Sequence, residues 1–162
     1  MLKVGILIGS DSDFPIMKPA VEFLKSFGIE FELRVASAHR TPNRVREFVT
    51  NGEKSGIQAF IVGAGAAAHL AGVVASYTTL PVVAVPINAT PLNGLDALLS
   101  TVQMPSGVPV ATMAVNGAKN SAIFVAEILA LSDESLAKKL KDYREDMADK
   151  VNEKNLRVQS QL

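Results

Sequence analysis

A short polar segment holds one of the two histidines of this chain and is the part best suited to acid–base chemistry. It is Ser37–Pro42, with the sequence SAHRTP. Imidazole changes its protonation near neutral pH, so His39 can serve as a general acid or base. The guanidinium of Arg40 can form two parallel hydrogen bonds with a phosphate or a carboxylate. Because Thr41-Pro42 is a helix start, capping does not explain Ser37, His39 or Arg40, and we expect this segment to serve a ligand.

A second polar cluster, GSDSD at Gly9–Asp13, precedes another predicted helix. The free N–H groups of a helix start attract anions, and the hydroxyls of Ser10 and Ser12 can bond phosphate oxygens. A carboxylate repels phosphate, so we assign Asp13 to sugar hydroxyls. Serine and aspartate are also the residues that cap helices, and simple capping is the alternative interpretation of this cluster.

A third cluster, GAGAAAH at Gly63–His69, is built from small residues that would let a flat ligand approach the backbone. It matches the loose dinucleotide pattern G-x-G-x-x-A, which by itself is a weak signal. The acidic residue expected about 20 positions later is missing, because the sequence there is Pro86-Ile87-Asn88. A dehydrogenase would bind NAD at this loop, and calorimetry with NAD tests that alternative. His69 is predicted to bind ligand, the alternative being a hydrogen bond to neighbouring backbone.

The elements that must position these clusters alternate between strand and helix. Strands are predicted over Lys3–Ile8, Glu30–Ala36, Ala59–Val62, Pro81–Val85 and Pro109–Val115. Helices are predicted from Pro15 to a stop at Gly28, from Thr41-Pro42, through an alanine-rich segment to about Tyr77, and over Ala118–Leu131. This alternation predicts a three-layer, doubly wound α/β fold of the flavodoxin or Rossmann type, with a parallel sheet covered on both faces. The three polar clusters follow strands directly, where such folds bind their ligands.

The C-terminal segment has a different character. We predict a single domain overall, with an α/β nucleotide-binding catalytic part at 1–131 and a C-terminal helix and tail at 132–162. The helix begins at Ser132-Asp133-Glu134 and reaches about Asn155. One narrow apolar stripe runs along it, formed by Leu136, Leu140, Tyr143, Met147 and Val151. Such a stripe needs a partner surface, which we expect on a neighbouring subunit, the alternative being the helix's own domain.

Composition excludes several classes of protein. The 162 residues are 48% apolar and 20% charged, and 16 basic residues balance 16 acidic ones, so we expect no nucleic-acid or anionic-membrane partner. Cysteine is absent and only two histidines occur, so we expect no metal site. Residues 57–75 carry no formal charge but contain glycines and a histidine, which favours strand, turn and helix over a membrane span. With no export signal apparent, we expect a cytoplasmic protein.

Five motifs together resemble the PurE family, the N5-carboxyaminoimidazole ribonucleotide mutases of purine biosynthesis. They are GSDSD at Gly9–Asp13, SAHRTP at Ser37–Pro42, GAGAAAHL at Gly63–Leu70, LNGLD at Leu92–Asp96 and QMPSGVPVAT at Gln103–Thr112. The likeness covers nearly the whole chain in order. It implies an isomerase of de novo purine (IMP) biosynthesis that moves a carboxylate from a nitrogen on the imidazole ring to carbon C4. The implied course is decarboxylation to aminoimidazole ribonucleotide and trapped CO2, followed by recarboxylation, with no cofactor.

The resemblance also implies a role for each residue. His39 would carry the proton. Arg40 and Ser10 would hold the 5′-phosphate, Asp13 the ribose, and Ser37 the phosphate or His39. The base and carboxylate would be bordered by Gly63, Ala64, Gly65, His69 and Leu70. Family members form octamers, so a homo-octamer binding a small ribonucleotide is expected.

Three positions depart from the family pattern: Ala66 replaces a glycine, Ala71 a proline and Ser106 an arginine. The added Cβ of Ala66 would crowd the pocket or stiffen its loop. Two alternatives to the mutase remain. One is a direct carboxylase that uses free CO2, which the bacterial-type QMP and GAG motifs disfavour. The other is a nucleotide-binding module without chemistry.

Overall fold

The computed structural model describes residues 2–162, and its first unit is built on a five-stranded parallel sheet. The strands are β1 (Lys3–Ile8), β2 (Glu30–Val35), β3 (Ala59–Gly65), β4 (Val82–Ile87) and β5 (Ala111–Thr112). They lie in the order β2-β1-β3-β4-β5, with every neighbouring pair parallel. This is the flavodoxin-type strand order, and it confirms the predicted doubly wound α/β fold.

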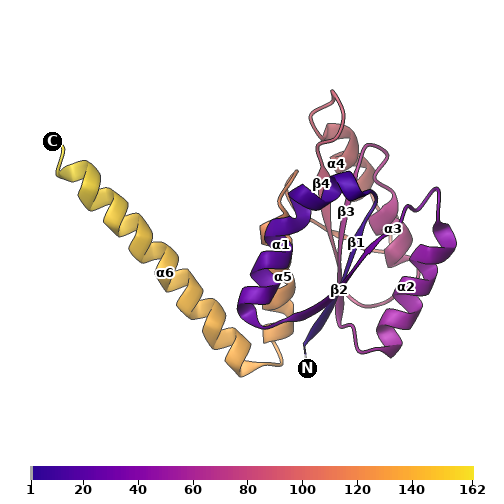
Figure 1. The fold of residues 1–162 in the computed structure, drawn as a ribbon, viewed down its shortest axis with the longest axis horizontal. Helices are drawn as coiled ribbons and strands as arrows, with labels where there is room; N and C mark the ends of the chain where they lie inside the picture. The colour runs from indigo at the N-terminus through magenta and orange to yellow at the C-terminus, as the bar shows by residue number, and fades with distance from the viewer. Residues whose placement is uncertain (1) are drawn as a thin grey trace. The chain divides into compact units, whose positions relative to one another are not determined.

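The helices are α1 (Phe14–Phe27), α2 (Pro42–Lys54), α3 (Leu70–Ala75), α4 (Leu95–Val102), α5 (Ala118–Ala130) and α6 (Glu134–Gln159), with a 3₁₀ turn, η1, at Asp11–Asp13. Figure 1 shows α1 and the beginning of α5 on one face of the sheet, and α2 and α3 on the other. Crossovers between parallel strands place helices on both faces in this way.

The core explains the sequence pattern of the strands. All residues of β4 and all but the first of β1 are buried, because helices cover both sides of these strands. β2 is the edge strand, and both of its ends are exposed. On the α2 and α3 face, Phe60 packs among residues that include Val45, Val49 and Val74.

Register brings three loops to one edge of the sheet. Ile8, the last residue of β1, is aligned with Val35 of β2 and with Gly63 of β3. The neighbouring strands β3 and β4 are aligned from Phe60↔Val82 to Gly65↔Ile87. The polar clusters that follow β1, β2 and β3 therefore begin at the same level, as predicted.

Helix boundaries agree with the local signals at α1 and α2. Pro15 lies in the first turn of α1, and Gly28 ends that helix with a φ of 72°. Pro42 occupies the first position of α2 after Thr41. Thr41 stands at the N-cap position, as predicted, but its hydroxyl makes no cap hydrogen bond and instead bonds the backbone of Ser37.

β4 is shifted to Val82–Ile87 and α6 ends at Gln159 rather than at about Asn155, and three further differences from the predicted elements are larger. The alanine-rich helix is only Leu70–Ala75, because β3 continues to Gly65 and a turn with Ala66 at a φ of 53° follows. The fifth strand has two residues rather than seven: Met113 N–H still donates to Ala84 O of β4, but the chain turns at Asn116, whose φ is 60°. Helix α4 was not predicted; its eight residues carry mixed apolar and polar side chains and no side-chain cap.

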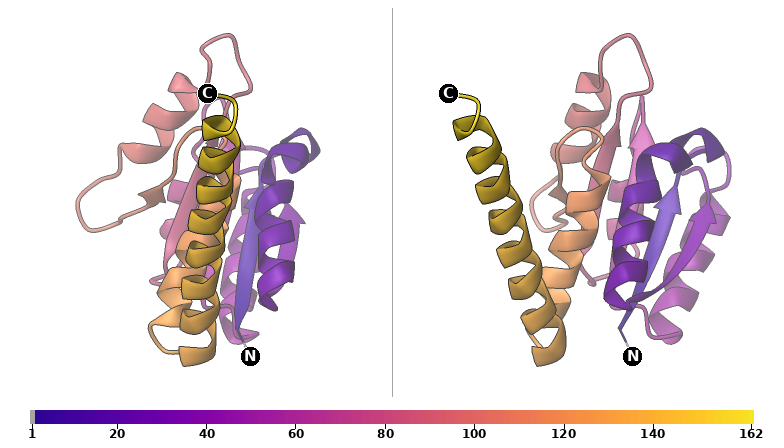
Figure 2. Two further views of the ribbon diagram at one scale, coloured as in Figure 1. Left: turned by 90° about the vertical axis from the view of Figure 1, so that its left-hand side faces the viewer. Right: turned by 60° about the vertical axis from the view of Figure 1, so that its left-hand side comes forward.

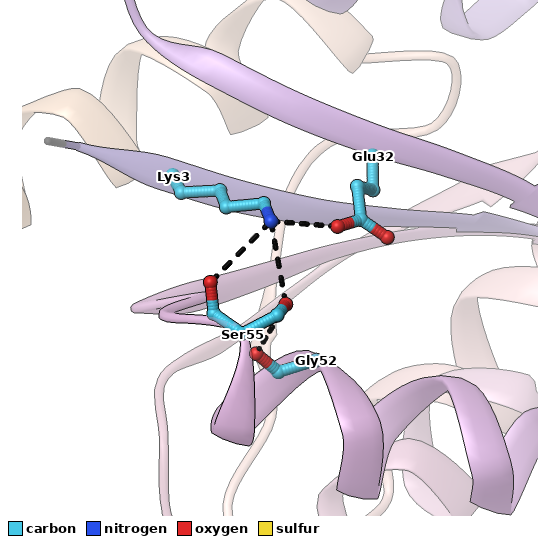
Figure 3. Close-up of polar contacts among 4 residues, drawn as sticks. All are labelled: Lys3, Glu32, Gly52 and Ser55. Carbon is cyan, nitrogen blue, oxygen red and sulfur yellow. Dashed lines mark hydrogen bonds and ion pairs between the residues drawn. The ribbon is translucent and has the colours of Figure 1, made fainter.

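The amino-terminal end of the sheet is fastened by a small polar cluster. Lys3 Nζ forms an ion pair with Glu32 Oε1 at 2.6 Å and donates to Ser55 Oγ at 3.3 Å (Figure 3). Ser55 Oγ in turn donates to Gly52 O at 3.0 Å. The cluster joins β1, β2 and the end of α2, but its ion pair is partly solvated and contributes only about 0–1 kcal/mol.

Two compact units are distinguished, the first ending at Val125 and the second spanning Ala126–Leu162, so that the boundary falls within α5. In the second unit, α6 is one uninterrupted helix of 26 residues (Figure 2). Asp133 caps it by accepting a 2.8 Å hydrogen bond from Leu136 N–H. Leu136 and Leu140 of the apolar stripe are buried, whereas Val151 is 61% exposed. No helix within residues 2–162 has the length and apolarity needed to cross a membrane.

Candidate active site

A cavity of about 370 Å³ opens at the carboxyl edge of the sheet. Loops that follow four strands contribute to it, which is where a doubly wound fold places a ligand. The lining residues are Gly9, Ser10, Ser12, Asp13, Ser37, Ala38, His39, Arg40, Ala64, Gly65, Ala66, Ala67, Leu70 and Ala89. The structure thus gathers most of the residues singled out by sequence around one space. Two of them, Gly63 and His69, are not part of the lining.

His69 instead contacts His39 directly. Its Nδ1 lies 2.8 Å from His39 Nε2, and the two ring planes are inclined by 80°. An N···N hydrogen bond requires a proton on one nitrogen and a lone pair on the other. The bonded pair can therefore carry one additional proton, but a second would break the bond. This arrangement orients His39 and gives its imidazolium form a hydrogen-bond acceptor.

The backbone after β2 forms a tight turn that presents His39 and Arg40. Thr41 N–H donates to Ser37 O at 2.9 Å, and Arg40 N–H donates to Ser37 Oγ at 3.2 Å. Ser37 N–H donates to Thr41 Oγ1 at 2.9 Å. The Ser37 hydroxyl and the Thr41 hydroxyl are thus used to shape the turn. Within residues 2–162 the guanidinium of Arg40 forms no ion pair, so it is available to an anion.

The loop after β1 is organised by reciprocal capping. Ser12 N–H donates to Ser10 Oγ, and Ser10 N–H donates to Asp13 Oδ2 at 2.9 Å. The hydroxyl of Ser12 donates to Ser10 Oγ at 2.9 Å. The capping interpretation of Ser10 and Asp13 is therefore correct, since they cap the 3₁₀ turn η1. Ser10, Ser12 and Asp13 also line the cavity, so capping and ligand contact are compatible here.

The pKa of the Asp13 carboxyl is raised above its ordinary value. Its side chain is only 6% exposed. Burial disfavours the ionised form and raises the pKa, while the hydrogen bonds from Ser10 and Gly9 N–H lower it and the charge of Asp11 raises it further. Burial has the largest effect, so the net change is upward.

The glycine-rich segment divides into a structural half and a cavity half. A Cβ on Gly63 would lie 2.7 Å from the sulfur of Met17, so this glycine permits close packing of β3 on α1. Gly65 faces Ala89, and Ala66 adopts the left-handed conformation with a φ of 53°. Four residues separate Gly65 from Leu70, where α3 begins, so the glycines do not open a helix as the dinucleotide pattern requires.

Ala66, which was expected to crowd the pocket, does line the cavity. Four further lining residues were not among the predicted site residues: Gly9, Ala38, Ala67 and Ala89 contribute small side chains or bare backbone to the wall. Alanine carries no chemical signal, but its position just beyond the end of β4 could have identified Ala89. Among residues 2–162, no three histidine or acidic side chains lie close enough to hold a metal ion.

Comparisons with known proteins agree with this geometry. A protein-family model with the description "AIR carboxylase" matches residues 3–150. The N5-carboxyaminoimidazole ribonucleotide mutase of Thermotoga maritima is 54% identical over 159 residues, covering 98% of this chain and 93% of that protein. The protein of the same name from Methanocaldococcus jannaschii is 59% identical over 148 residues, covering 91% and 92%. The crystal structure of Treponema denticola PurE superposes with a TM-score of 0.87 at 32% identity, covering 94% of this chain and 96% of that chain.

Substituting Asp13 should flatten the pH dependence of stability. With its pKa raised above the ordinary 3.8, folded Asp13 holds its proton to higher pH than the unfolded chain does. The free energy of unfolding therefore falls as pH rises through the interval just above 3.8, by at most about 1.4 kcal/mol per pH unit. Urea unfolding across this interval should show the decline in the wild type and a smaller one in Asp13→Asn. An Asp11→Asn variant, changed in the same loop, removes only the smallest contribution to the raised pKa and should keep most of the decline; equal slopes for all three proteins would contradict the prediction.

Replacing Ala66 by glycine should stabilise the fold. A non-glycine residue in the left-handed region is disfavoured by about 1–2 kcal/mol, and glycine relieves this at some cost in chain entropy. We expect Ala66→Gly to raise the free energy of unfolding by up to about 1 kcal/mol. Ala67→Gly is the matched control, because Ala67 is exposed in the same loop without a positive φ, and we expect it to lower stability by about 0.5–1 kcal/mol. A loss of stability in both variants would show that the Ala66 conformation is not strained.

Proposed function

The chain belongs to the AIR carboxylase (PurE) family, and from this premise we propose that it is an N5-carboxyaminoimidazole ribonucleotide mutase of purine biosynthesis. The product is 4-carboxy-5-aminoimidazole ribonucleotide. The reaction is an isomerisation, because one carboxylate changes its point of attachment and nothing is added or lost. The observation that carries the proposal is the His39–His69 pair at a cavity that also presents Arg40 and the serines of the first loop.

The proposed chemistry needs one proton carrier and a closed space. In the first step the N–CO2 bond breaks, CO2 leaves without the bonding electron pair, and the nitrogen takes a proton from His39. In the second step the electron-rich ring carbon C4 attacks CO2, and the proton on C4 passes to His39. The protein begins and ends with the same number of protons. Since aminoimidazole is itself nucleophilic, orientation and exclusion of water are what the cavity must supply.

Each side chain of the cavity has a proposed part in this scheme. The unpaired guanidinium of Arg40 and the hydroxyls of Ser10 and Ser12 hold the 5′-phosphate, with Ser37 supporting the Arg40 turn. Asp13 faces the ribose, using the carboxylate oxygen that does not accept from Ser10. The ring and the migrating carboxylate lie against Ala64, Gly65 and Leu70. His69 acts through His39, and Gly63 through the packing of β3.

Replacing His39 by asparagine should abolish most of the mutase activity. Loss of a general acid–base group lowers kcat by roughly 10²–10⁴-fold. Because the His39 side chain is exposed and its loop is held by Ser37 and Thr41, the variant should remain folded and still bind aminoimidazole ribonucleotide. Conversion of N5-carboxyaminoimidazole ribonucleotide, followed by the absorbance of the product, measures the loss. A variant as active as the wild type would show that His39 is not the proton carrier, whereas inactivity of both proteins would leave the binding-module alternative.

The same assay distinguishes the mutase from a direct carboxylase. A direct carboxylase converts aminoimidazole ribonucleotide at low bicarbonate without any N-carboxylated substrate. We expect the wild-type protein to be slow under those conditions and fast with the N-carboxylated substrate.

We further propose that the protein is a cytoplasmic homo-octamer, in which 132–162 packs on a neighbouring subunit. Support comes from apolar side chains that stay exposed within one chain. On α6 these are Met147 and Val151, 40% and 61% exposed. A second group of exposed apolar side chains is formed by Leu92, in the turn before α4, and by Leu95, Leu99 and Val102 of α4, and each residue is between 46% and 62% exposed.

Adding charge to the α6 stripe should reduce the size of the assembly. We expect the double variant Met147→Lys, Val151→Lys to elute as a smaller species with light-scattering detection, since two desolvated lysines oppose an apolar contact. The matched control is Asp149→Asn, Asn152→Lys, which adds the same charge to the opposite side of the same helix. Retention of the full assembly by the stripe variant would refute a role for this helix in the contact.

A further inference from the structure

Ala89 is the one residue of the β4–α4 connection that lines the cavity. It sits directly against the glycine turn, because a Cβ added to Gly65 would lie 2.7 Å from the Ala89 Cβ and 3.1 Å from Ile87 O. The bare backbone of Gly65 thus accommodates the Ala89 methyl group. The connection and the turn together form one continuous stretch of wall made from small groups.

Asn88, the residue before Ala89, is held by a hydrogen bond to a residue that follows β5. Asn88 N–H donates to Asn116 Oδ1 at 2.9 Å. Asn116 adopts a left-handed conformation, with a φ of 60°, and its own N–H donates to Pro86 O at 2.9 Å. Asn116 therefore satisfies backbone groups on both sides of Ile87, and it continues the pairing of β4 beyond the two-residue strand β5.

Thr90, the residue after Ala89, is held by a hydrogen bond to a residue of α4. The Thr90 hydroxyl donates to Asp96 Oδ2 at 2.8 Å and accepts from Leu92 N–H at 3.2 Å. The other carboxylate oxygen, Asp96 Oδ1, is buried and has no partner within residues 2–162. Burying an unpaired carboxylate oxygen is unfavourable. The Thr90 bond is the only side-chain hydrogen bond that the Asp96 carboxylate makes in the described chain, so anchoring the loop is the role its position indicates.

We propose that Thr90, Asp96 and Asn116 are positioning residues that hold Ala89 against Gly65 and so keep the cavity closed around CO2. The proposal rests on the proposed mutase function. Carbon dioxide is small and uncharged, so the wall retains it by shape rather than by attraction. If the loop is released, Ala89 moves away from Gly65, and CO2 escapes from some turnovers. The ring then leaves as aminoimidazole ribonucleotide instead of the carboxylated product.

The chain offers a matched pair of threonines for the test. Thr78 lies in the loop before β4, its hydroxyl donates to the Glu53 carboxylate, and it accepts from Leu80 N–H at 3.0 Å. Thr78 thus copies the bonding of Thr90 at the opposite end of β4. Thr90→Val and Thr78→Val remove the same groups, and the change in melting temperature of each variant records the common structural effect.

The readout is the fraction of turnovers that release aminoimidazole ribonucleotide from N5-carboxyaminoimidazole ribonucleotide, compared with spontaneous breakdown in buffer. We expect Thr90→Val to raise this fraction about 3- to 10-fold and to lower kcat for the carboxylated product by a similar factor, while KM changes less than about 2-fold. Thr78→Val should match the wild type in all three quantities. An equal released fraction in Thr90→Val and Thr78→Val would overturn the proposal.

A second site keeps the test decisive if Thr90→Val does not fold. Asn116→Gly preserves the left-handed backbone but removes the side-chain acceptor, whereas Asn116→Asp keeps an acceptor for Asn88 N–H. We expect the released fraction of aminoimidazole ribonucleotide to increase in Asn116→Gly and to stay close to the wild-type value in Asn116→Asp. An Asn116→Gly enzyme that releases no more aminoimidazole ribonucleotide than the wild type contradicts the proposal. If the wild type itself does not convert the N-carboxylated substrate, the proposed function fails first, and the two failures are thereby distinguished.

Discussion

Parallel pairing of β1 with both β2 and β3 is the constraint on which the site depends. Ile8 is aligned with Val35 on one side and Gly63 on the other, so β1 and β2 end at one level and β3 ends two residues beyond it. The right-handed crossovers place α1 on one face of the sheet and α2 on the other. The loops between these strands and helices diverge, and the cavity lies where they do. A one-residue shift in the β1 pairing would move the loops out of line and turn buried side chains toward the opposite face.

The pairing also decides which histidine contacts which. His39 follows β2 and His69 follows β3, with β1 between the two strands. Their 2.8 Å contact therefore bridges the loop of β1, whose Ser10 and Asp13 line the same cavity. Under the proposed reaction one proton is moved and later recovered. A pair of rings that shares a hydrogen bond, and tolerates one added proton, suits a carrier that must return to its starting state.

Strong periodic signals made the fold predictable, and the wrong predictions have non-local causes. β1 has the predicted bounds because its apolar run is continuous, and α5 begins at the predicted residue. α1 has a proline in its first turn and ends at the predicted glycine. The alanine-rich segment looked like one long helix because alanine favours helix, yet pairing with β1 and β4 extends β3 to Gly65 and leaves only six helical residues. β5 contracts because the chain turns at Asn116. Contacts with distant strands decided both outcomes, and local propensity does not contain them.

The same limit applies to the site. Serine, histidine and arginine at strand ends identified the polar half of the cavity, because their chemistry is visible in single residues. The histidine contact was not predicted, since it depends on the distance between two loops. Most of the alanines of the cavity wall were not predicted, because the role of a small side chain depends on the tertiary contacts that hold it in place. One such contact joins α4 to the alanine-rich loop before α3: Thr101 Oγ1 donates to Ala97 O at 2.7 Å and lies 3.4 Å from Ala68 O.

A division between an apolar lining and polar supports follows from the proposed chemistry. A charged or hydroxylic group beside CO2 would bring water or act as a competing nucleophile, so methyl groups and bare backbone are the suitable neighbours. Methyl groups form no hydrogen bonds, however, and a loop made of them is not fixed by its own side chains. The fixing bonds must then lie one residue away, as they do on both sides of Ala89. The strained φ of Ala66 fits the same logic, because a residue with a Cβ has fewer alternative conformations than glycine and limits the motion of its turn.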